Sequence, residues 1–440
     1  MFGWVKKKVV LKVFVCFLPL LFLLIECSSE KQSSDFAGQK SKYLDYAASW
    51  QINEEALVEF VKVSRIQGNS SGINPHSEQL KQLENRATKI IAGKIGANRE
   101  QIHYVSCASV ANNIAILGVA HKNPGCHLIT SKIEHKSILN VFKYLEKKGY
   151  EVTYLNVNRY GNIDLKQLKN SIRRNTKLVS VQMFNREIGT LQNMREIGKI
   201  AHEHGILFHS DAAQSFCKYD IDVNEMEIDL LTISGYKIGA PKGIAALYVR
   251  DVERIQPLMF GSGDELFPGT KSTALICAFG KAVEKFTFDK KRICKNYAAL
   301  VNELKKMDGV FINSSEPSHI VSVSIAGVLL KDVLDRMRDF SFSAGCSCLG
   351  QGKSNVIEAI DSQGKLPGCT LRISFSDVVE TEQLIDFAKK LRRVVEQLRK
   401  EKMVGESCES TLSESEQKKL KGNLDDIQKI LSKGMTGENS

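Results

Sequence analysis

A lysine and an aspartate, 26 residues apart, are the two side chains of this sequence best suited to act together on a bound ring. Lys237 follows an apolar segment and lies in a glycine-rich bend, which can present its amine to a cofactor. Asp211 ends another apolar segment, and a carboxylate at the buried end of a strand is costly unless it is paired. A protonated pyridine ring is a suitable partner, so the two residues together favour catalysis with a pyridine cofactor.

The last third of the chain adds two thiols and an arginine. Cys346 and Cys348 lie among small residues, a composition that favours a mobile loop whose thiol can swing to a substrate. Arg372 follows 24 residues after Cys348, in an apolar segment typical of a strand. Its planar guanidinium can bond both oxygens of a carboxylate.

These residues belong to motifs that resemble the class V aminotransferase superfamily over about 350 of the 440 residues, and within it the NifS/IscS-type cysteine desulfurases. The resemblance implies a fold-type I pyridoxal-phosphate (PLP) enzyme, with a large α/β domain built on a mainly parallel sheet and a smaller α+β C-terminal domain. The motifs that carry it are Tyr43–Ala48, Ser106–Asn113, Glu134–Lys136, Asp211–Gln214, Ser234–Gly243 and Ser343–Cys348.

The resemblance also implies a role for each residue around the cofactor ring. Lys237 would bind the cofactor covalently and remove the substrate Cα proton, and Asp211 would keep the pyridine nitrogen protonated. Gln214 would bond the phenolic oxygen. His135 would stack on the ring and take part in proton transfer. Asn185 would contact the cofactor and the substrate carboxylate.

A second group of residues would hold the phosphate. Backbone N–H groups at a helix start favour a phosphate dianion, so Ala108 and Ser109 are the expected cradle, together with Ser234. Gly269-Thr270 resembles the pair that contacts the phosphate from the neighbouring subunit, and Thr270 therefore implies a homodimer with shared active sites. No metal site is expected.

The same resemblance implies a reaction. Arg372 would grip the α-carboxylate of L-cysteine, and the thiolate of Cys348 would take the substrate sulfur as a persulfide and release L-alanine. Cys346 falls where the family has a serine. A sulfur-acceptor protein is then an expected partner.

Several positions depart from the family pattern and leave two other functions open. Cys107 replaces a glycine, Arg186 replaces the second asparagine of its motif, and Tyr236 replaces a histidine. Trp50 stands where the family has a small polar residue. Another class V PLP reaction, such as transamination or lyase chemistry, is the first alternative. An exported relative without catalysis, retained for binding, is the second.

The elements that must position these residues alternate between short apolar strands and amphipathic helices. This alternation, with its glycine breaks, predicts an α/β sheet covered by helices on both faces. A helix is predicted around 194–204. Strands are predicted at 128–131, 151–157, 177–184, 206–209, 230–233 and 244–249, and later at 320–325 and 371–375.

The chain is predicted to have five segments. Residues 42–290 form the PLP-binding large domain, and 291–402 form the small C-terminal domain with the loop that carries Cys348. Residues 28–41 are a polar linker, and 403–440 a polar tail. One short amphipathic helix is predicted in the tail, marked by Leu420, Leu424, Ile427 and Leu431.

Residues 1–27 are typical of a signal peptide or membrane anchor. Lys6-Lys7-Lys8 precedes an apolar run, 13–25, that is short for a stable membrane span. Cys27 follows the run at the place where a bacterial lipoprotein would be acylated. We therefore expect membrane association or export through this segment alone, with a cytoplasmic location as the alternative.

Composition excludes several other classes of protein. The net charge of +11 comes from 61 basic and 50 acidic residues. The basic residues form no long run, which argues against a dedicated nucleic-acid surface. The 11 cysteines are irregularly spaced, which fits neither a zinc site nor a secreted disulfide framework. With 43% hydrophobic residues, the chain can bury the core of a two-domain enzyme.

Overall fold

The computed structural model describes residues 42–344 and 354–411. Lys42 and residues 338–341 form one small unit, in which the Lys42 N–H donates to the carbonyl oxygen of Asp339 at 2.9 Å. Strands β1 (Lys42–Tyr43) and β11 (Phe340–Ser341) form a two-stranded sheet. The remaining residues from Tyr43 onward form the second unit, which contains the two larger sheets. In the described part of the chain, no helix is long and apolar enough to cross a membrane.

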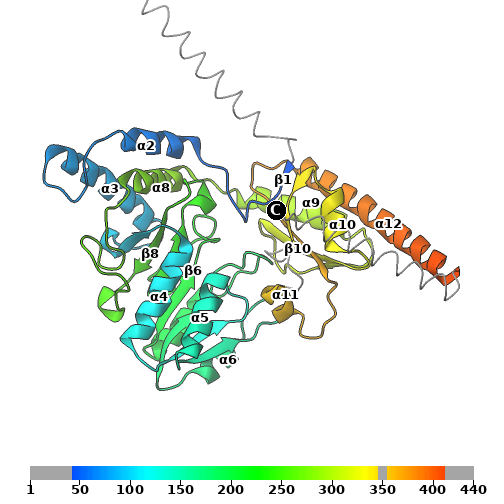
Figure 1. Cartoon of the computed structure of the whole chain (residues 1–440), viewed down its shortest axis with the longest axis horizontal. Coiled ribbons are helices and arrows are strands. Elements are labelled where there is room, and N and C mark those ends of the chain that lie inside the picture. The colour runs from blue at the N-terminus through cyan, green and yellow to red at the C-terminus, as the bar shows by residue number, and fades with distance from the viewer. Residues whose placement is uncertain (1–41, 345–353, 412–440) are drawn as a thin grey trace, which may run out of the picture. The chain divides into compact units, whose positions relative to one another are not determined.

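The larger sheet has seven strands in the order β2-β8-β7-β6-β5-β3-β4 (Figure 1). From β7 to β4 the strands run parallel, whereas β8 is antiparallel to both of its neighbours. The carboxyl ends of parallel strands share one edge, which is where open α/β sheets bind ligands. The strands are β2 (Ile102–Val105), β3 (His127–Ser131), β4 (Glu151–Leu155), β5 (Thr176–Ser180), β6 (Leu207–Asp211), β7 (Leu230–Ser234) and β8 (Ala245–Val249).

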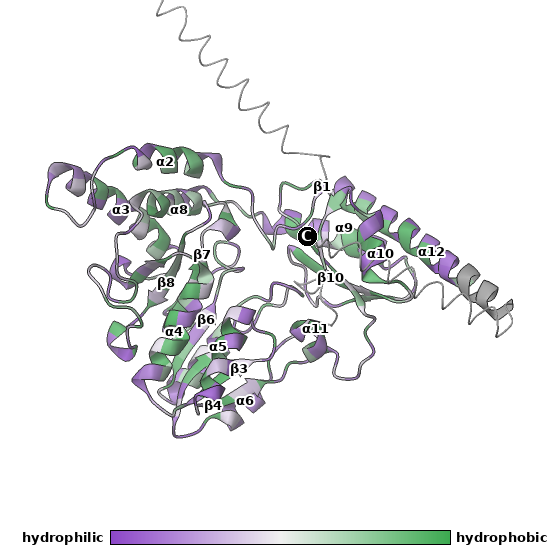
Figure 2. Ribbon diagram, viewed as in Figure 1, coloured by the Kyte–Doolittle hydropathy of each residue, from purple (hydrophilic) through white to green (hydrophobic). Residues whose placement is uncertain are grey.

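Both faces of this sheet are apolar, because successive strand residues enter different parts of the core. Leu207 and Leu230 pack in a cluster with residues of α4 and α5, whereas Phe208 and Leu231 pack in a cluster with residues of α3, α7 and α8. Figure 2 shows hydrophobic residues along β7, β8 and α4. Parallel sheets are typically buried on both faces, and near-continuous apolar runs follow from that.

The helices of this part of the chain pack on the two faces, with α4 and α5 side by side in Figure 1. They are α2 (Glu54–Ser64), α3 (Pro75–Gly93), α4 (Ala108–Lys122), α5 (Lys136–Lys147), α6 (Leu165–Ser171), α7 (Met194–Glu203) and α8 (Thr273–Lys285). Short 3₁₀ turns form at η1 (Arg99–Gln101), η2 (Tyr236–Ile238) and η3 (Val252–Arg254).

The second sheet is antiparallel, with the strand order β12-β13-β10-β9. It places Arg372 in the middle of a strand, opposite Ser322 on one side and Ser343 on the other. Its strands are β9 (Val310–Ile312), β10 (Ile320–Ile325), β12 (Ser343–Ala344) and β13 (Cys369–Ser374). The helices of this region are α9 (Lys290–Leu304), α10 (Leu330–Arg336), α11 (Asn355–Ile360) and α12 (Thr381–Thr411).

The predicted α/β fold class, with its mainly parallel sheet, is confirmed, and each predicted strand is present within a few residues. The sequence analysis missed β2, a four-residue strand that contains a polar residue. Its His103 is buried against Asp264, with Nδ1 and Oδ1 3.0 Å apart. The domain boundary at residue 290 stays a prediction. The N-terminal leader and the tail helix lie outside the described residues.

Candidate active site

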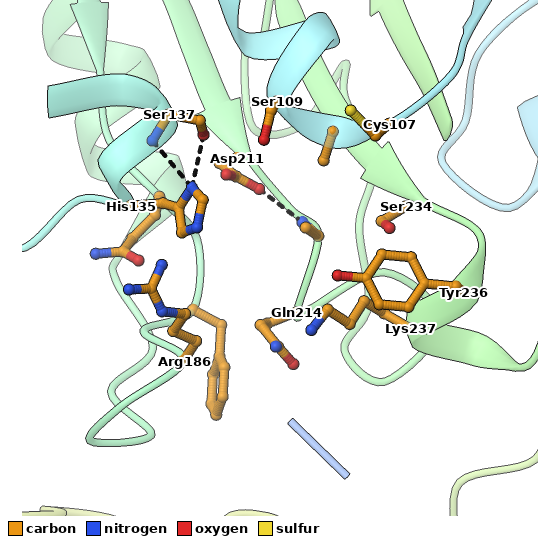
Figure 3. A pocket seen from close by; sticks show the side chains of 14 residues that line it. Cys107, Ser109, His135, Ser137, Arg186, Asp211, Gln214, Ser234, Tyr236 and Lys237 are labelled. Carbon is orange, nitrogen blue, oxygen red and sulfur yellow. Dashed lines mark hydrogen bonds between the residues drawn. The ribbon is translucent and has the colours of Figure 1, made fainter. Parts of the chain in front are cut away.

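A pocket lies at the carboxyl edge of the seven-stranded sheet (Figure 3). Asp211 is the last residue of β6, Ser234 is the last residue of β7, and His135 follows β3 by four residues. The parallel strands thus bring together residues up to 99 positions apart. The pocket is lined by Cys107, Ala108, Ser109, His135, Ser137, Gln182, Phe184, Arg186, Asp211, Ala213, Gln214, Ser234, Tyr236 and Lys237.

Lys237 lies in the 3₁₀ turn that directly follows β7. Gly239 ends the turn with φ of +85°, a left-handed conformation that favours glycine, and its carbonyl oxygen accepts from the Asn53 N–H at 2.8 Å. The lysine Nζ donates to the backbone carbonyls of Ala47 and Ala48, the latter at 2.8 Å. The turn therefore holds the amine against the segment that follows Asp45.

Burial is the main reason why the pKa of Lys237 is lowered from 10.5 to about 7. The positive charges of Arg372, Lys218 and Arg186 lower the pKa further, and Asp45 opposes them. Removal from water disfavours an ammonium more than a neutral amine. Near neutral pH the pocket therefore holds a substantial population of the nucleophilic, unprotonated amine.

This lowered pKa predicts a pH profile for covalent labelling of Lys237 in the cofactor-free protein. An acylating reagent attacks only the neutral amine, so modification should rise through about pH 7 and not near 10.5. Peptide mass spectrometry of samples labelled between about pH 5 and about pH 10 measures the modified fraction of Lys237 at each pH. Lys242, which is exposed, serves as the internal control. Identical profiles for the two lysines would contradict the prediction.

A hydrogen-bonded chain connects Asp211 with His135. The Nδ2 of Asn112 donates to Asp211 Oδ2 and to Ser137 Oγ, both at 2.9 Å. Ser137 Oγ lies 2.7 Å from His135 Nδ1, and the Ser137 N–H donates to the same nitrogen at 3.1 Å. Because Nδ1 accepts the backbone N–H, the proton of a neutral His135 ring belongs on Nε2.

Two acidic residues, at and beside the hydrogen-bonded chain from Asp211 to His135, are held by different contacts. Asp211 also accepts from the Ala213 N–H at 2.9 Å, so each of its oxygens has a donor. Glu134 is fully buried beside His135, where it accepts from Ser131 Oγ and from the Gln182 N–H. Burial raises the pKa of Glu134 to about 8, so this residue is largely neutral at neutral pH and fixes the backbone before His135.

The start of α4 faces the pocket with the backbone N–H groups of its first turn. Ala108 and Ser109 are the first two residues of the helix, and both line the pocket. Cys107 precedes them with φ of −162° and ψ of 162°, an extended conformation that any residue adopts, so the turn does not need the family's glycine. This arrangement suits an anion such as a phosphate.

Two buried side-chain atoms in this pocket are left for a ligand to satisfy. Neither Ser234 Oγ nor Gln214 Oε1 has a hydrogen-bond partner within residues 42–344 and 354–411. The Nε2 of Gln214, by contrast, donates to the Ala47 carbonyl oxygen at 2.7 Å. A buried polar group without a partner is costly, so these two atoms favour a polar ligand in the pocket.

Two of the predicted substrate ligands do not line this pocket. The Nη2 of Arg372 donates to Asp45 Oδ1 at 2.7 Å and to Ser343 Oγ at 3.0 Å, and its Nη1 donates to the Arg186 carbonyl oxygen at 3.2 Å. Asn185 Oδ1 accepts from the backbone of its own turn, at Glu187 and Ile188, which stabilises the loop before them. The roles predicted for Arg372 and Asn185 stay predictions.

The remaining predicted residues lie elsewhere. Thr270 lines a different pocket, with Tyr104 and Lys271, and the role predicted for it stays a prediction. Cys346 and Cys348 lie outside the described residues.

The sequence analysis did not assign a role to several pocket residues. Asn112 and Ser137 are the connecting members of the Asp211–His135 chain. Asn112 is fully buried in helix α4, whose other buried residues are apolar, and a polar residue at a core position of a helix is the signal that could have identified it. Phe184 and Arg186 also line the pocket, next to Asn185 in the chain.

Comparison with known proteins agrees with this site. The model of the family "Aminotransferase class-V" matches residues 42–387. A mitosomal cysteine desulfurase of Encephalitozoon cuniculi is 37% identical over 349 residues, which cover 74% of this chain and 81% of that protein. The cysteine desulfurase IscS of Ehrlichia chaffeensis is 35% identical, and the match covers 81% of this chain and 92% of that protein.

Solved structures show the same relationship. A structure described as SspA in complex with cysteine has a TM-score of 0.70 and 36% identity, covering 77% of this chain and 99% of that one. A NifS-like protein has a TM-score of 0.74 and 25% identity, covering 81% and 99%. This chain belongs to the class V aminotransferase family, whose members are PLP-dependent enzymes, and the two relatives from Encephalitozoon cuniculi and Ehrlichia chaffeensis are cysteine desulfurases.

Proposed function

We propose that this protein is a PLP-dependent cysteine desulfurase, which converts L-cysteine to L-alanine and transfers the sulfur to one of its own cysteines. The observation that carries the proposal is the position of Lys237. Its amine, with a pKa of about 7, lies in one pocket with Asp211 and with the N-terminus of α4. The relatives at 35–37% identity favour cysteine as the substrate.

The residues present fit PLP. Ser234 and the first turn of α4 would hold the phosphate, and Gln214 Oε1 would accept a hydrogen bond from the phenolic oxygen in its protonated form. Asp211, whose two oxygens are already oriented by Asn112 and Ala213, would hold a proton on the ring nitrogen. When bound, the cofactor supplies an electron-poor ring that stabilises negative charge at the substrate Cα.

The side chains of Lys237 and His135 would carry out the proton transfers. Lys237 Nζ, neutral at its lowered pKa, accepts the proton from the substrate Cα. His135 keeps a proton on Nε2 because Ser137 occupies Nδ1, so the ring presents a donor from that nitrogen. Asn112 donates both to Asp211 and to Ser137, the residue that bonds His135. The orientation of His135 therefore depends on the same residue that holds Asp211.

The sulfur step requires a thiolate, for which Cys348 is the candidate. Its sulfur attacks the sulfur of L-cysteine, the substrate C–S bond breaks, and an enzyme persulfide and L-alanine result. A sulfur-acceptor protein would then collect the persulfide sulfur. A homodimer in which Thr270 serves the neighbouring site is part of this proposal.

The test is product analysis with the purified full-length chain. L-cysteine and a reductant should give L-alanine and sulfide in equal amounts. Asp211→Asn should keep the fold but slow both products roughly 10²–10³-fold, because a neutral amide cannot hold the ring proton. Conversion of L-cysteine to a keto acid, or alanine without sulfide, would contradict the proposal and favour another class V reaction.

A further inference from the structure

Lys218 is a buried cation next to Lys237, and the mechanism described so far does not use it. Lys218 is 2% exposed, and lysine is almost never fully buried unless it is paired. The titratable groups beside it supply no negative charge at neutral pH. Burial raises the pKa of the Cys217 thiol to about 12, and burial holds the pKa of His319 well below its usual range, so both side chains are neutral. Other contacts must therefore offset the cost of burying this ammonium.

One carbonyl oxygen and two aromatic rings surround the amine of Lys218. Its Nζ donates to the backbone carbonyl oxygen of Lys237 at 3.0 Å. The same atom lies over the ring of Trp50, 5.0 Å from the ring centroid, and over the ring of Phe286 at 5.6 Å. These two rings contact each other edge to face, with their centroids 5.2 Å apart. A cation within about 6 Å of a ring face is attracted by the ring, most strongly by tryptophan, so the three contacts favour the ammonium form.

Two features of this chain hold Lys218 in its place. Trp50 stands where the family has a small polar residue, which offers no ring face to a cation. Cys217, directly before Lys218, has φ of +62°, a left-handed conformation that is uncommon for a residue other than glycine. Such a strained conformation persists only where the surrounding contacts fix it. The backbone is therefore strained at the point where Lys218 enters the core.

Lys218 also connects the two segments that hold Lys237. Its hydrogen bond fixes the backbone carbonyl of Lys237, while the side-chain amine of Lys237 donates to the carbonyl oxygen of Ala47. Trp50, whose ring lies beside the Lys218 ammonium, follows Ala47 by three residues. Gln214 Nε2 donates to the same Ala47 oxygen, and Figure 3 shows Gln214 beside the amine of Lys237. Lys218 thus contacts both the turn that carries the amine and the segment that receives it.

We propose that Lys218 is a positioning residue for the catalytic base: its ammonium bridges the carbonyl oxygen of Lys237 and the ring of Trp50, and so fixes the place of the Lys237 amine. The proposal rests on the proposed function in that Lys237 is the base.

The same ammonium acts on Lys237 through its charge. After burial, the positive charges of Arg372, Lys218 and Arg186 lower the pKa of Lys237, and Asp45 opposes them. Burial lowers the pKa of Lys218 itself to about 7, so the two lysines titrate in the same range. A neighbouring positive charge disfavours the ammonium form of an amine. Loss of Lys218 should therefore make the Lys237 amine easier to protonate.

The first test is the pH profile of Lys237 labelling in the cofactor-free, full-length chain. In Lys218→Met the midpoint of labelling should move to higher pH, by roughly half a pH unit or more, because one nearby positive charge is lost. Lys218→Gln keeps an N–H donor for the carbonyl but not the charge, and its midpoint should move in the same direction. Lys218→Arg keeps the charge and should leave the midpoint unchanged.

Lys285→Met is the matched control. Lys285 is an exposed cation that lines a separate pocket with Trp50 and Phe286, whereas the charges that lower the pKa of Lys237 come from other residues. This variant should keep the original labelling midpoint and the original turnover of L-cysteine.

The second test is the kinetics of the cofactor-loaded enzyme. In Lys218→Met the kcat for L-cysteine should fall about tenfold, because the turn that carries the base loses its support. The KM should change less than about twofold, since Lys218 does not line the pocket. Lys218→Gln should recover most of the kcat, because its amide can still donate to the carbonyl oxygen of Lys237.

An unchanged labelling midpoint in Lys218→Met, or an equal shift in Lys285→Met, would overturn the proposal, and so would an unchanged kcat in Lys218→Met. If Lys218→Met does not fold, the labelling midpoint of Lys218→Gln decides. Labelling requires neither the cofactor nor sulfur chemistry, so its result stays valid if the desulfurase assay fails.

Discussion

Lys237→Ala is expected to abolish covalent cofactor binding and activity together. The amine of Lys237 lies in the pocket with a pKa of about 7, and its loss removes both the covalent anchor and the base. Proton transfer by one positioned side chain is worth roughly 10²–10⁴-fold in rate, so the turnover of L-cysteine should fall by at least that factor. The measurements are the visible absorbance of the purified variant after gel filtration and its sulfide production.

Lys242→Ala is the control for this experiment. Lys242 lies five residues further along the chain, is exposed, and does not line the pocket. Its replacement should leave the absorbance and the rate unchanged. If instead Lys237→Ala keeps its visible band and Lys242→Ala loses it, the anchor has been assigned to the wrong lysine.

Cys348→Ser is expected to stop sulfur transfer and to leave substrate binding intact. A serine hydroxyl is far too weak a nucleophile at neutral pH, so sulfide release in the presence of a reductant should fall to background. Lys237, Asp211 and the start of α4 are unchanged, so the variant should keep its cofactor and should still change its spectrum when L-cysteine is added.

Cys346→Ser is the matched control, because the family has serine at that position. It should keep most of the activity. An essential Cys346 with a dispensable Cys348 would show that the nucleophile is two residues earlier. Full activity in the double variant would contradict a persulfide mechanism altogether and would support transamination or lyase chemistry.

The position of several pocket residues could be predicted from the sequence, because Asp211, Ser234 and Lys237 lie at or next to the end of a strand that is visible in the sequence. Apolar runs that end in Asp211 and Ser234 predict strands, and parallel strands bring their carboxyl ends to one edge. These strands, together with the resemblance to the family's motifs, placed Lys237, Asp211 and the start of α4 at one site. The pattern of apolar residues could not reveal β2, because its four residues form a strand only by pairing with β8.

By itself the sequence determined the fold class, the family and the chemical types in the pocket, since side-chain identity and strand periodicity are local properties. Only the tertiary structure decided how those groups are paired. The pairing of Arg372 with Asp45, across 327 positions, and the chain from Asp211 through Asn112 depend on contacts between distant segments. The pKa of Lys237 depends on burial, which no single segment determines. For the same reason, only the packed pocket showed that Ser234 Oγ and Gln214 Oε1 have no hydrogen-bond partner within the described residues.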